Sequence, residues 1–408
     1  MDVTFPPEVE AFRERVRAFL RDNLPEHWQG IGALDDSERI AFGRRWRDLV
    51  SREGLLAVAW PKEFGGAGLG PLEQFVLAEE FIGAGVPLRP LPGDQHGLTL
   101  IGPTILQVGT QEQKRFFVPK ILSGEHRWAQ GYSEPDAGSD LAAIRTRAVL
   151  HGDEWVINGQ KTWQTSGDAA NWIFILARTD PDAAKHAGLS LLVLPIDQPG
   201  VEVRPIRTLT GHAEFCEFFF TDAKASADHV IGGVNNGWKA AMTLLGFERG
   251  SSVAAAAAAA RLELDRLAEL IRRRGLADDP LIRQRFAWCW SRVTVLRYLA
   301  LRAVTRLVQD APAGPESSIL KLYISTYQQR VTELAMDVLA MDATVLSGTT
   351  AVAHLGPDPL GGANDPAAWE TVFLTARAAT IYGGSSQIQR NLIAERVLGL
   401  PRESAAQR

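Results

Sequence analysis

The chain has 408 residues, of which 46% are apolar, and its formal net charge is −5. This length allows a large core and about two or three structural units rather than one. The slightly acidic balance does not favour a nucleic-acid partner or an anionic membrane surface. The longest apolar tract, Val253 to Ala260, is too short to span a bilayer, so no membrane span is predicted.

Cysteine and histidine usage gives no sign of a metal site. The two cysteines, Cys216 and Cys289, make neither a disulfide framework nor a zinc site, and the eight histidines are scattered. The acidic start of the chain lacks the apolar segment of a secretory signal. Because free cysteines fit a reducing compartment, we expect a cytoplasmic protein without a metal.

The N-terminal part of the chain has a helical pattern. Apolar residues recur at helical spacing from Val9 to Leu20, after a helix start at Pro7. A further helix is predicted over Gln111 to Leu122, and whether Pro119 breaks it is left open.

The pattern changes at about Trp128. Aromatic and branched residues then form short runs separated by turn dipeptides, and Asn158-Gly159 is a strong hairpin signal. Further strands are expected over Trp172 to Ala177, Leu189 to Leu194 and Phe215 to Phe220. The sequence therefore predicts an all-β insert of about a hundred residues.

Long helical segments return after Gly237. Alanine, the strongest helix former, fills Ala254 to Ala260, and its small side chain suits close helix packing. A helical bundle is predicted from four segments: Trp238 to Arg274, Pro280 to Gln309, Ser317 to Thr344 and Trp369 to Ala379.

Several common catalytic signatures are missing from the sequence. No G-x-G-x-x-G follows a strand, and there is no P-loop, H-E-x-x-H or G-x-S-x-G motif. A Rossmann nucleotide site, phosphoryl transfer, metal catalysis and hydrolysis are therefore disfavoured.

Three other segments attract attention. They are Q-G-Y-S-E-P-D-A-G-S-D (Gln130 to Asp140), N-G-Q-K-T-W-Q-T-S-G (Asn158 to Gly167) and I-Y-G-G-S-S-Q-I-Q-R-N (Ile381 to Asn391). Taken singly, the first also fits an ordinary turn-rich loop, and the second also fits the far strand of a hairpin with Trp163 in the core. The third also fits a helix start that Ser385 or Ser386 caps.

Together, in this order and between helical regions, the three segments resemble those of the acyl-CoA dehydrogenase family. The resemblance covers essentially the whole chain, including W-P-K-E-F-G-G-A-G at Trp60 to Gly68 and the closing A-E-R-V-L-G-L-P. It implies an α+β fold with an N-terminal α-helical domain (1–127), a middle β-barrel or sandwich domain (128–237) and a C-terminal four-helix bundle (238–408).

The resemblance also implies FAD, which the family binds between the β domain and the C-terminal helices. Tyr132 and Ser133 would meet the flavin ring, Trp163 and Thr165 would cover it and hydrogen-bond to it, and Ser139 would lie near the pyrophosphate and the acyl-CoA. The implied cofactor contacts are Tyr132, Ser133, Gly138, Ser139, Trp163, Thr165, Gly384, Ser385, Ser386 and Gln387. Fixed donors and an aromatic wall orient such a ring and tune its electron affinity.

The implied reaction is α,β-dehydrogenation of an acyl-CoA, with electrons passed to an electron-transfer flavoprotein. Many members carry the catalytic base as Glu in I-Y-E-G, but this chain has Gly383 there, which cannot take a proton. The resemblance implies that the Gly383 N–H is one donor to the substrate oxygen and that a flavin ribityl hydroxyl is the other. Other members place the base on a C-terminal helix before an Arg, and Glu248 in L-L-G-F-E-R-G fits. Arg249 would orient the substrate or balance charge. The alternative for Glu248 is a helix-surface carboxylate.

A second departure concerns the adenine half of the cofactor site. Homotetrameric members usually have a basic residue and an F-G turn after the first bundle helix, and Q-x-x-G-G on a later helix. This chain has R-R-R-G-L-A-D-D-P (272–280) and A-M-D-A-T (Ala340 to Thr344). We therefore expect a dimer of dimers completed by a second acyl-CoA dehydrogenase-like chain, similar to the actinobacterial heterotetramers, several of which act on steroid side-chain CoA esters.

Two other functions remain open on the sequence. The chain could be a non-catalytic subunit that completes a partner's flavin site, although its intact Y-S-E-P-D-A-G-S-D and G-G-S-S-Q segments argue against this. It could also be an oxidase or monooxygenase on the same scaffold, although an oxidase usually adds a C-terminal domain that this length does not accommodate.

Overall fold

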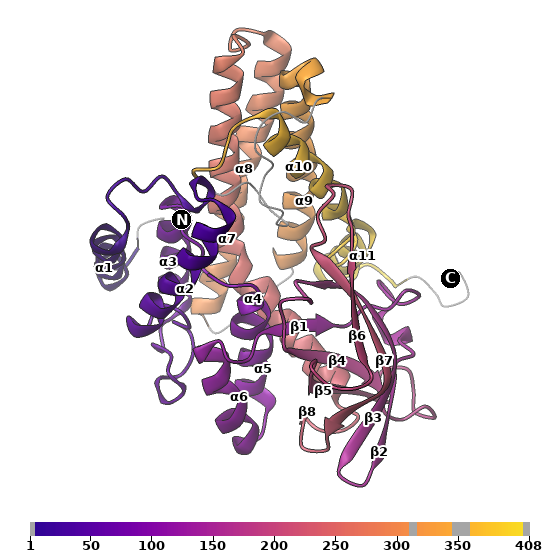
Figure 1. Cartoon of the computed structure of the whole chain (residues 1–408). Coiled ribbons are helices and arrows are strands. Elements are labelled where there is room, and N and C mark those ends of the chain that lie inside the picture. Colours follow the sequence, from indigo (N-terminus) through magenta and orange to yellow (C-terminus); the bar gives the residue numbers. More distant parts are fainter. Residues whose placement is uncertain (1–4, 310–315, 345–359, 403–408) are drawn as a thin grey trace. The chain divides into compact units, whose positions relative to one another are not determined.

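A computed structural model describes residues 5–309, 316–344 and 360–402, apart from the side chains of 248–254 and 316–317 (Figure 1). The chain forms two compact units. The helical unit comprises Met1–Arg39, Gly70–Leu88 and Gly250–Arg408, and the mixed unit comprises Ile40–Leu69 and Arg89–Arg249. The boundaries of the three predicted domains stay a prediction.

The mixed unit contains one sheet and several helices. Helices α4 (Asp94–His96), α5 (Gly102–Val108) and α6 (Gln111–Ser123) precede the strands, and α2 (Asp36–Arg52) and α7 (Gly237–Arg273) each include a unit boundary. The strands are β1 (Trp128–Gly131), β2 (Arg147–His151), β3 (Glu154–Thr165), β4 (Trp172–Arg178), β5 (Leu189–Pro195), β6 (Val201–Ile206), β7 (Phe215–Ser226) and β8 (Val230–Ile231). Their order is β6-β7-β3-β2-β4-β5-β8, and β1 pairs in parallel with β4.

Strand β4 is buried on both of its faces. Ile173, Ile175 and Ala177 pack with residues of β3, β5 and β7, because alternate side chains of a strand point to opposite faces. Phe174 and Leu176 pack instead with residues of the helices. A sheet whose strands share an inner apolar core in this way is the predicted barrel or sandwich.

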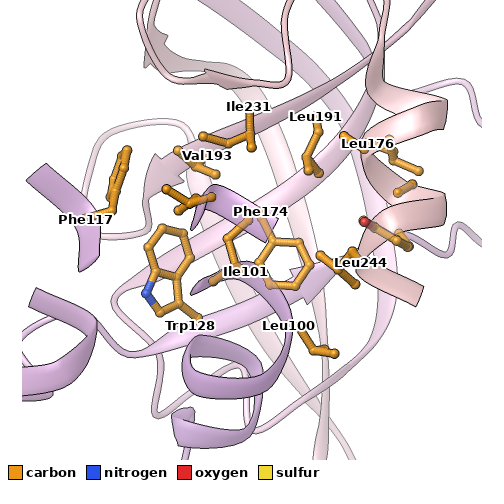
Figure 2. Close-up of a cluster of buried hydrophobic side chains, with 14 of the residues drawn as sticks. Leu100, Ile101, Phe117, Trp128, Phe174, Leu176, Leu191, Val193, Ile231 and Leu244 are labelled. Atoms are coloured by element: carbon orange, nitrogen blue, oxygen red, sulfur yellow. The ribbon is translucent and has the colours of Figure 1, made fainter. Parts of the chain in front are cut away.

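Helices cover the second face of β4. In Figure 2, Ile101 from the π-helical turn Gly97–Ile101 and Leu244 from α7 lie beside Phe174, and Phe117 from α6 belongs to the same cluster. These side chains are fully buried. Burial of one such side chain contributes about 1.5–3 kcal/mol, so this cluster fixes the segments that enter and leave the sheet.

The predicted hairpin at Asn158-Gly159 is wrong. Strand β3 continues through both residues, and the turn at Gly152 joins β2 to β3 instead. The pairing of β3 with β7 shifts by one residue between Ile157 and Gly159, where φ of Gly159 is 151°. A Cβ on Gly159 would lie 2.5 Å from Thr146 Oγ1, so the glycine permits a close approach of β2 rather than a chain reversal.

Helix α6 is not broken at Pro119, which lies inside Gln111–Ser123. A capping box fixes the start of this helix: Thr110 Oγ1 accepts from the Gln113 N–H at 3.2 Å, and Gln113 Oε1 accepts from the Thr110 N–H at 3.0 Å. Capping and the burial of Phe117, Val118 and Ile121 outweigh the hydrogen bond that the proline removes.

The helical unit contains a bundle, in which the predicted helices are found. Its elements are α1 (Pro7–Asn23), α3 (Pro71–Gly83), most of α7, α8 (Pro280–Val308), α9 (Glu316–Leu339), α10 (Pro366–Ala376) and α11 (Ser386–Leu392). One apolar core joins α3, α7, α8, α9 and α10. Alanine gives room for close packing: the buried Tyr327 hydroxyl of α9 donates to the Ala260 carbonyl of α7 at 3.0 Å.

Two buried histidines make the mixed unit sensitive to acid. The His126 ring stacks on Trp172 with 4.5 Å between centroids. Burial, followed by the positive charge of Lys120, lowers the pKa of His126 to about 4, although Glu125 acts in the opposite direction and His229 adds to the lowering. Burial likewise lowers the pKa of His96 to about 4.

We predict that stability falls as the pH falls from about 6.5 toward 4. In this range the unfolded chain binds protons at both histidines that the folded chain does not. His126→Phe should reduce the loss of unfolding free energy between pH 7 and pH 5 by about 1–2 kcal/mol. Urea unfolding at the two pH values measures this loss, with exposed His151→Phe as the control. Equal losses in wild type and His126→Phe would contradict the prediction.

Candidate functional site

The segment after β1 forms a tight turn in the mixed unit. Glu134 and Ala137 exchange two backbone hydrogen bonds of 3.1 Å, which close the turn around Pro135 and Asp136. Gly138 and Ser139 are exposed, and a Cβ on Gly138 would meet nothing within 4 Å. These two predicted cofactor residues therefore lie at an open surface of the unit, where a ligand can reach the backbone.

The Glu134 carboxylate is buried and fully used inside the protein. Its Oε1 accepts from Lys161 Nζ at 2.8 Å and from the Thr146 N–H at 2.9 Å, and its Oε2 accepts from the Arg145 N–H at 2.6 Å. Burial works to raise the pKa of Glu134, but the charge and hydrogen bond of Lys161 lower it overall. Glu134 is therefore a structural anion and not a proton acceptor.

Lys161 is the cation of this pair and has no exposed surface. Burial lowers its pKa to about 8, against the opposing effect of Glu134. Its Nζ also donates to the Tyr132 carbonyl at 3.1 Å. The sequence reasoning did not select Lys161 or Glu134, although both stand inside the segments it singled out; the opposite charges in those two motifs were the available signal.

Hydrogen bonds to the backbone carbonyls of Tyr132 and Ser133 fix the position of these two residues. The Ser133 carbonyl accepts from the Thr162 N–H at 3.0 Å, and the Tyr132 carbonyl is held by Lys161. Within the described ranges, no hydrogen bond uses the Ser133 N–H or its hydroxyl. Ser133 thus keeps two polar groups for a ligand.

Trp163 is not a core residue. The pairing of β3 with β7 shifts between Lys161 and Gln164, and Trp163 occupies this bulge with φ of 69° and 58% of its surface exposed. Its ring meets the Phe215 ring edge-on, with 5.9 Å between centroids. A bulky residue with positive φ is strained, and such strain concentrates at functional sites.

Thr165 follows the bulge at the end of β3. It pairs with Phe215 of β7 and is partly exposed. The strand ends at once, because Ser166 takes φ of 52° and its N–H donates to the Glu214 carbonyl at 2.9 Å. The mixed unit therefore brings together four of the predicted residues: Tyr132, Ser133, Trp163 and Thr165.

The third motif forms a glycine turn before α11 in the helical unit. Gly383 and Gly384 have φ of 61° and 88°. Gln389 Nε2 donates to the Gly383 carbonyl at 3.1 Å and would have to move to admit a Cβ at Gly384, which would lie 2.5 Å from that nitrogen. Ser385 is the cap, since its hydroxyl accepts from the Ile388 N–H at 3.3 Å.

The next two predicted residues differ in exposure. Ser386 is buried at the first position of α11, and Gln387 is exposed.

Lys321 of α9 lies near this glycine turn: its Nζ donates to the Ala379 carbonyl at 2.9 Å, and its Cε would lie 3.8 Å from a Cβ on Gly383. Burial lowers the pKa of Lys321 to about 8. The sequence reasoning also missed Lys321, because its helical position alone does not indicate a site.

Glu248 and Arg249 belong to α7, but their side chains lie outside the described part of the chain.

The two segments that depart from the homotetramer pattern, 272–280 and Ala340–Thr344, lie within the described residues. Helix α7 is followed by Gly275 with φ of 69°, and Asp279 caps α8 by accepting from the Leu281 N–H at 2.8 Å. Arg274 Nη1 lies 2.5 Å from Asp342 Oδ2, so an ion pair within the chain joins the two segments.

Neither a metal cluster nor a membrane-spanning helix is found among the residues that the structure describes. Across 5–309, 316–344 and 360–402, no three acidic, histidine or cysteine side chains are grouped to hold a metal ion. In the same ranges, no helix combines the length and apolar character needed to cross a bilayer.

Comparison with known proteins gives a family for the whole chain. Residues 6–125, 129–223 and 235–398 match the N-terminal, middle and C-terminal domains of acyl-CoA dehydrogenase. Acyl-CoA dehydrogenase IpdE1 of Mycobacterium tuberculosis is 42% identical over 97% of this chain and 99% of its own length. Acyl-CoA dehydrogenase FadE26 of the same organism is 29% identical over 98% and 99%.

Solved structures agree with this family. The Tcur3481–Tcur3483 steroid ACAD is 29% identical with a TM-score of 0.81, covering 99% of this chain and 100% of the other. The ChsE4–ChsE5 complex from Mycobacterium tuberculosis is 28% identical with a TM-score of 0.78, covering 99% and 100%. The chain therefore belongs to the acyl-CoA dehydrogenase family, whose members are flavoproteins of fatty acid or steroid β-oxidation, and it is an oxidoreductase.

We predict that Trp163→Gly weakens FAD binding without lowering the melting temperature. Glycine takes a φ of 69° without strain, and the exposed indole contributes little to the core, so the melting temperature should stay the same or rise. The sequence predicts this indole as an aromatic wall for a flavin ring, so FAD affinity should fall at least about tenfold. Thermal melts and flavin titrations measure the two effects.

Trp163→Val is the matched control. A β-branched residue tolerates positive φ poorly, so this variant should lose stability as well as FAD affinity. A clearly lower melting temperature for Trp163→Gly than for the wild type would show that the indole is mainly structural, and equal melting temperatures for the two variants would show that the positive φ carries little strain.

Proposed function

We propose that this chain is the FAD-containing catalytic subunit of an acyl-CoA dehydrogenase that converts an acyl-CoA thioester to its trans-2-enoyl-CoA. The observation that carries the proposal is the hydrogen-bonded contact between the backbone segments of Trp163 and Ser133. An exposed indole on strained backbone lies next to Thr162, which binds the Ser133 carbonyl, and Ser133 keeps its N–H and hydroxyl for a ligand. An aromatic face beside fixed donors suits a flat, polar ring such as the flavin.

The residues present fit FAD in both units. In the mixed unit, Tyr132, Ser133, Gly138, Ser139, Trp163 and Thr165 would hold it. In the helical unit, the turn at Gly384 and the following Ser385, Ser386 and Gln387 would contact it, since a glycine turn lets a ligand approach the backbone closely. When bound, FAD supplies the acceptor for the hydride that leaves the substrate β-carbon.

Glu248 is the proposed base for the α-proton. Gly383 has no side chain that can take a proton, so the role passes to the carboxylate of L-L-G-F-E-R-G on α7. A thioester α-proton is weakly acidic, and its removal places negative charge on the carbonyl oxygen. The Gly383 N–H would donate to this oxygen, Arg249 would orient the substrate, and Ser139 would contact the acyl-CoA.

We predict that Glu248→Gln retains FAD. The rate at which acyl-CoA bleaches its flavin should fall at least about 10³-fold, because the amide cannot accept the proton. Stopped-flow absorbance of the flavin band under anaerobic conditions measures this rate. Asp265→Asn, a half-exposed carboxylate of the same helix, is the control and should bleach normally. Bleaching by Glu248→Gln at the wild-type rate would refute the assignment.

The proposed substrate class is a steroid-derived acyl-CoA, and the proposed electron acceptor is an electron-transfer flavoprotein. The steroid assignment is supported by the similarity over the full chain to the Tcur3481–Tcur3483 steroid ACAD. An oxidase on the same scaffold would instead release peroxide under air without an added acceptor. Assays of acyl-CoA esters from short chain to steroid identify the substrate class. The same assays with and without an artificial acceptor distinguish a dehydrogenase from an oxidase.

We further propose a heterotetramer, a dimer of dimers that includes a second acyl-CoA dehydrogenase-like chain. The two segments that would reach a neighbouring flavin in homotetramers are instead joined to each other by Arg274 and Asp342. Two similar structures, Tcur3481–Tcur3483 and ChsE4–ChsE5, are assemblies of two different chains.

The proposed heterotetramer predicts that the chain purified alone and the chain co-expressed with its partner contain different amounts of flavin. The chain purified alone should lose most of its flavin on gel filtration, whereas the chain co-expressed with its partner should keep the yellow absorbance. Light scattering with simultaneous flavin absorbance measures both mass and occupancy. A flavin-replete homotetramer would contradict the assembly, and a yellow complex in which only the partner's site holds flavin, at half of the full occupancy, would favour the non-catalytic alternative.

A further inference from the structure

The ion pair between Lys161 and Glu134 is unlike the other pairs of the sheet. Lys161 is fully buried and Glu134 is 8% exposed, whereas Lys224 and Glu154, which are 2.6 Å apart on β7 and β3, are about half exposed. A buried ion pair is seldom more stable than apolar residues of the same volume. Stability alone is therefore a poor explanation of the buried pair.

The contacts of the pair join the two segments that carry the proposed flavin residues. Lys161 lies on β3, two residues before Trp163, and its Nζ reaches both the Tyr132 carbonyl and the Glu134 carboxylate. The carboxylate also accepts from the N–H groups of Arg145 and Thr146, which lead into β2. One ammonium group thus fixes the segment after β1 against the strand that carries the bulge.

The pair also sets the direction of one peptide group. A trans peptide is planar, with its carbonyl and its N–H on opposite sides. Because the Tyr132 carbonyl points to the buried Lys161 Nζ, the Ser133 N–H of the same peptide points away from the buried pair. The Ser133 carbonyl is held by the Thr162 N–H, so rotation of either neighbouring peptide would break a hydrogen bond.

We propose that Lys161 is a positioning residue which, together with Glu134, holds the Ser133 N–H and the Trp163 bulge in the arrangement that receives the flavin ring. The inference rests on the proposed function, because it concerns the same ligand. It assigns no chemical step to either residue. It predicts that loss of both charges loosens these segments and weakens flavin retention while the fold persists.

The test uses the full chain with Lys161→Met and Glu134→Gln combined, so that no lone charge is left buried. Hydrogen exchange should become at least about tenfold faster in peptides covering 131–134 and 161–165, and should stay unchanged in 172–178 of β4. In the flavin-loaded assembly, FAD should dissociate at least about tenfold faster, and the resolved bands of its visible spectrum should broaden.

Two controls separate positioning from general loss of stability. Lys224→Met with Glu154→Gln removes an exposed pair between β7 and β3, and Ile157→Val removes a methyl group from the buried face of β3. Both should keep wild-type exchange at 131–134 and 161–165 and the wild-type rate of FAD release.

The outcomes are distinguishable. Wild-type exchange at both segments in the combined variant would overturn the positioning role, as would faster exchange spread evenly over the sheet. Faster local exchange with an unchanged rate of FAD release and an unchanged spectrum would overturn the link to the flavin. If no assembly containing the wild-type chain binds FAD, the proposed function fails, and the exchange measurement still decides whether Lys161 orders the two segments.

Discussion

The buried contact of Lys161 with Glu134 is the interaction on which the mixed unit's candidate site depends. Removing two charges from water is costly, and the structure offsets the cost by giving the carboxylate three donors and the ammonium two acceptors. The same hydrogen bonds define the path of the backbone on both sides. A buried polar network that is hydrogen-bonded in this way rigidifies its surroundings, and it does so more specifically than a comparable apolar cluster.

The sequence was sufficient for most of the architecture. Helical periodicity predicted α1, and branched and aromatic runs predicted β4, β5 and β7, because each pattern follows from which face is buried. The hairpin expected at Asn158-Gly159 is wrong, and the break left open at Pro119 does not occur, for one reason. Local turn and breaker preferences are weak beside tertiary packing, which here keeps β3 continuous past Thr146 and α6 continuous over its buried face.

The candidate site was less accessible to sequence reasoning. Motifs located Ser133, Trp163 and the Gly383-Gly384 turn, but they did not show that Trp163 is exposed on a bulge or that Lys161 is buried. Those properties depend on the register of β3 against β7, which is a pairing between residues more than 50 positions apart. The role of Glu248 stays a prediction, because it depends on a side chain outside the described residues.

The sheet of the mixed unit ends in strands that discourage pairing with another chain. In the described order, one end is β6, which carries Pro205 and the charged pair Glu202 and Arg204, and the other is β8, which has two residues. A proline removes a donor from the strand, charges oppose stacking, and a two-residue strand offers almost no template. These two ends of the sheet therefore offer little template for edge-to-edge pairing with another chain.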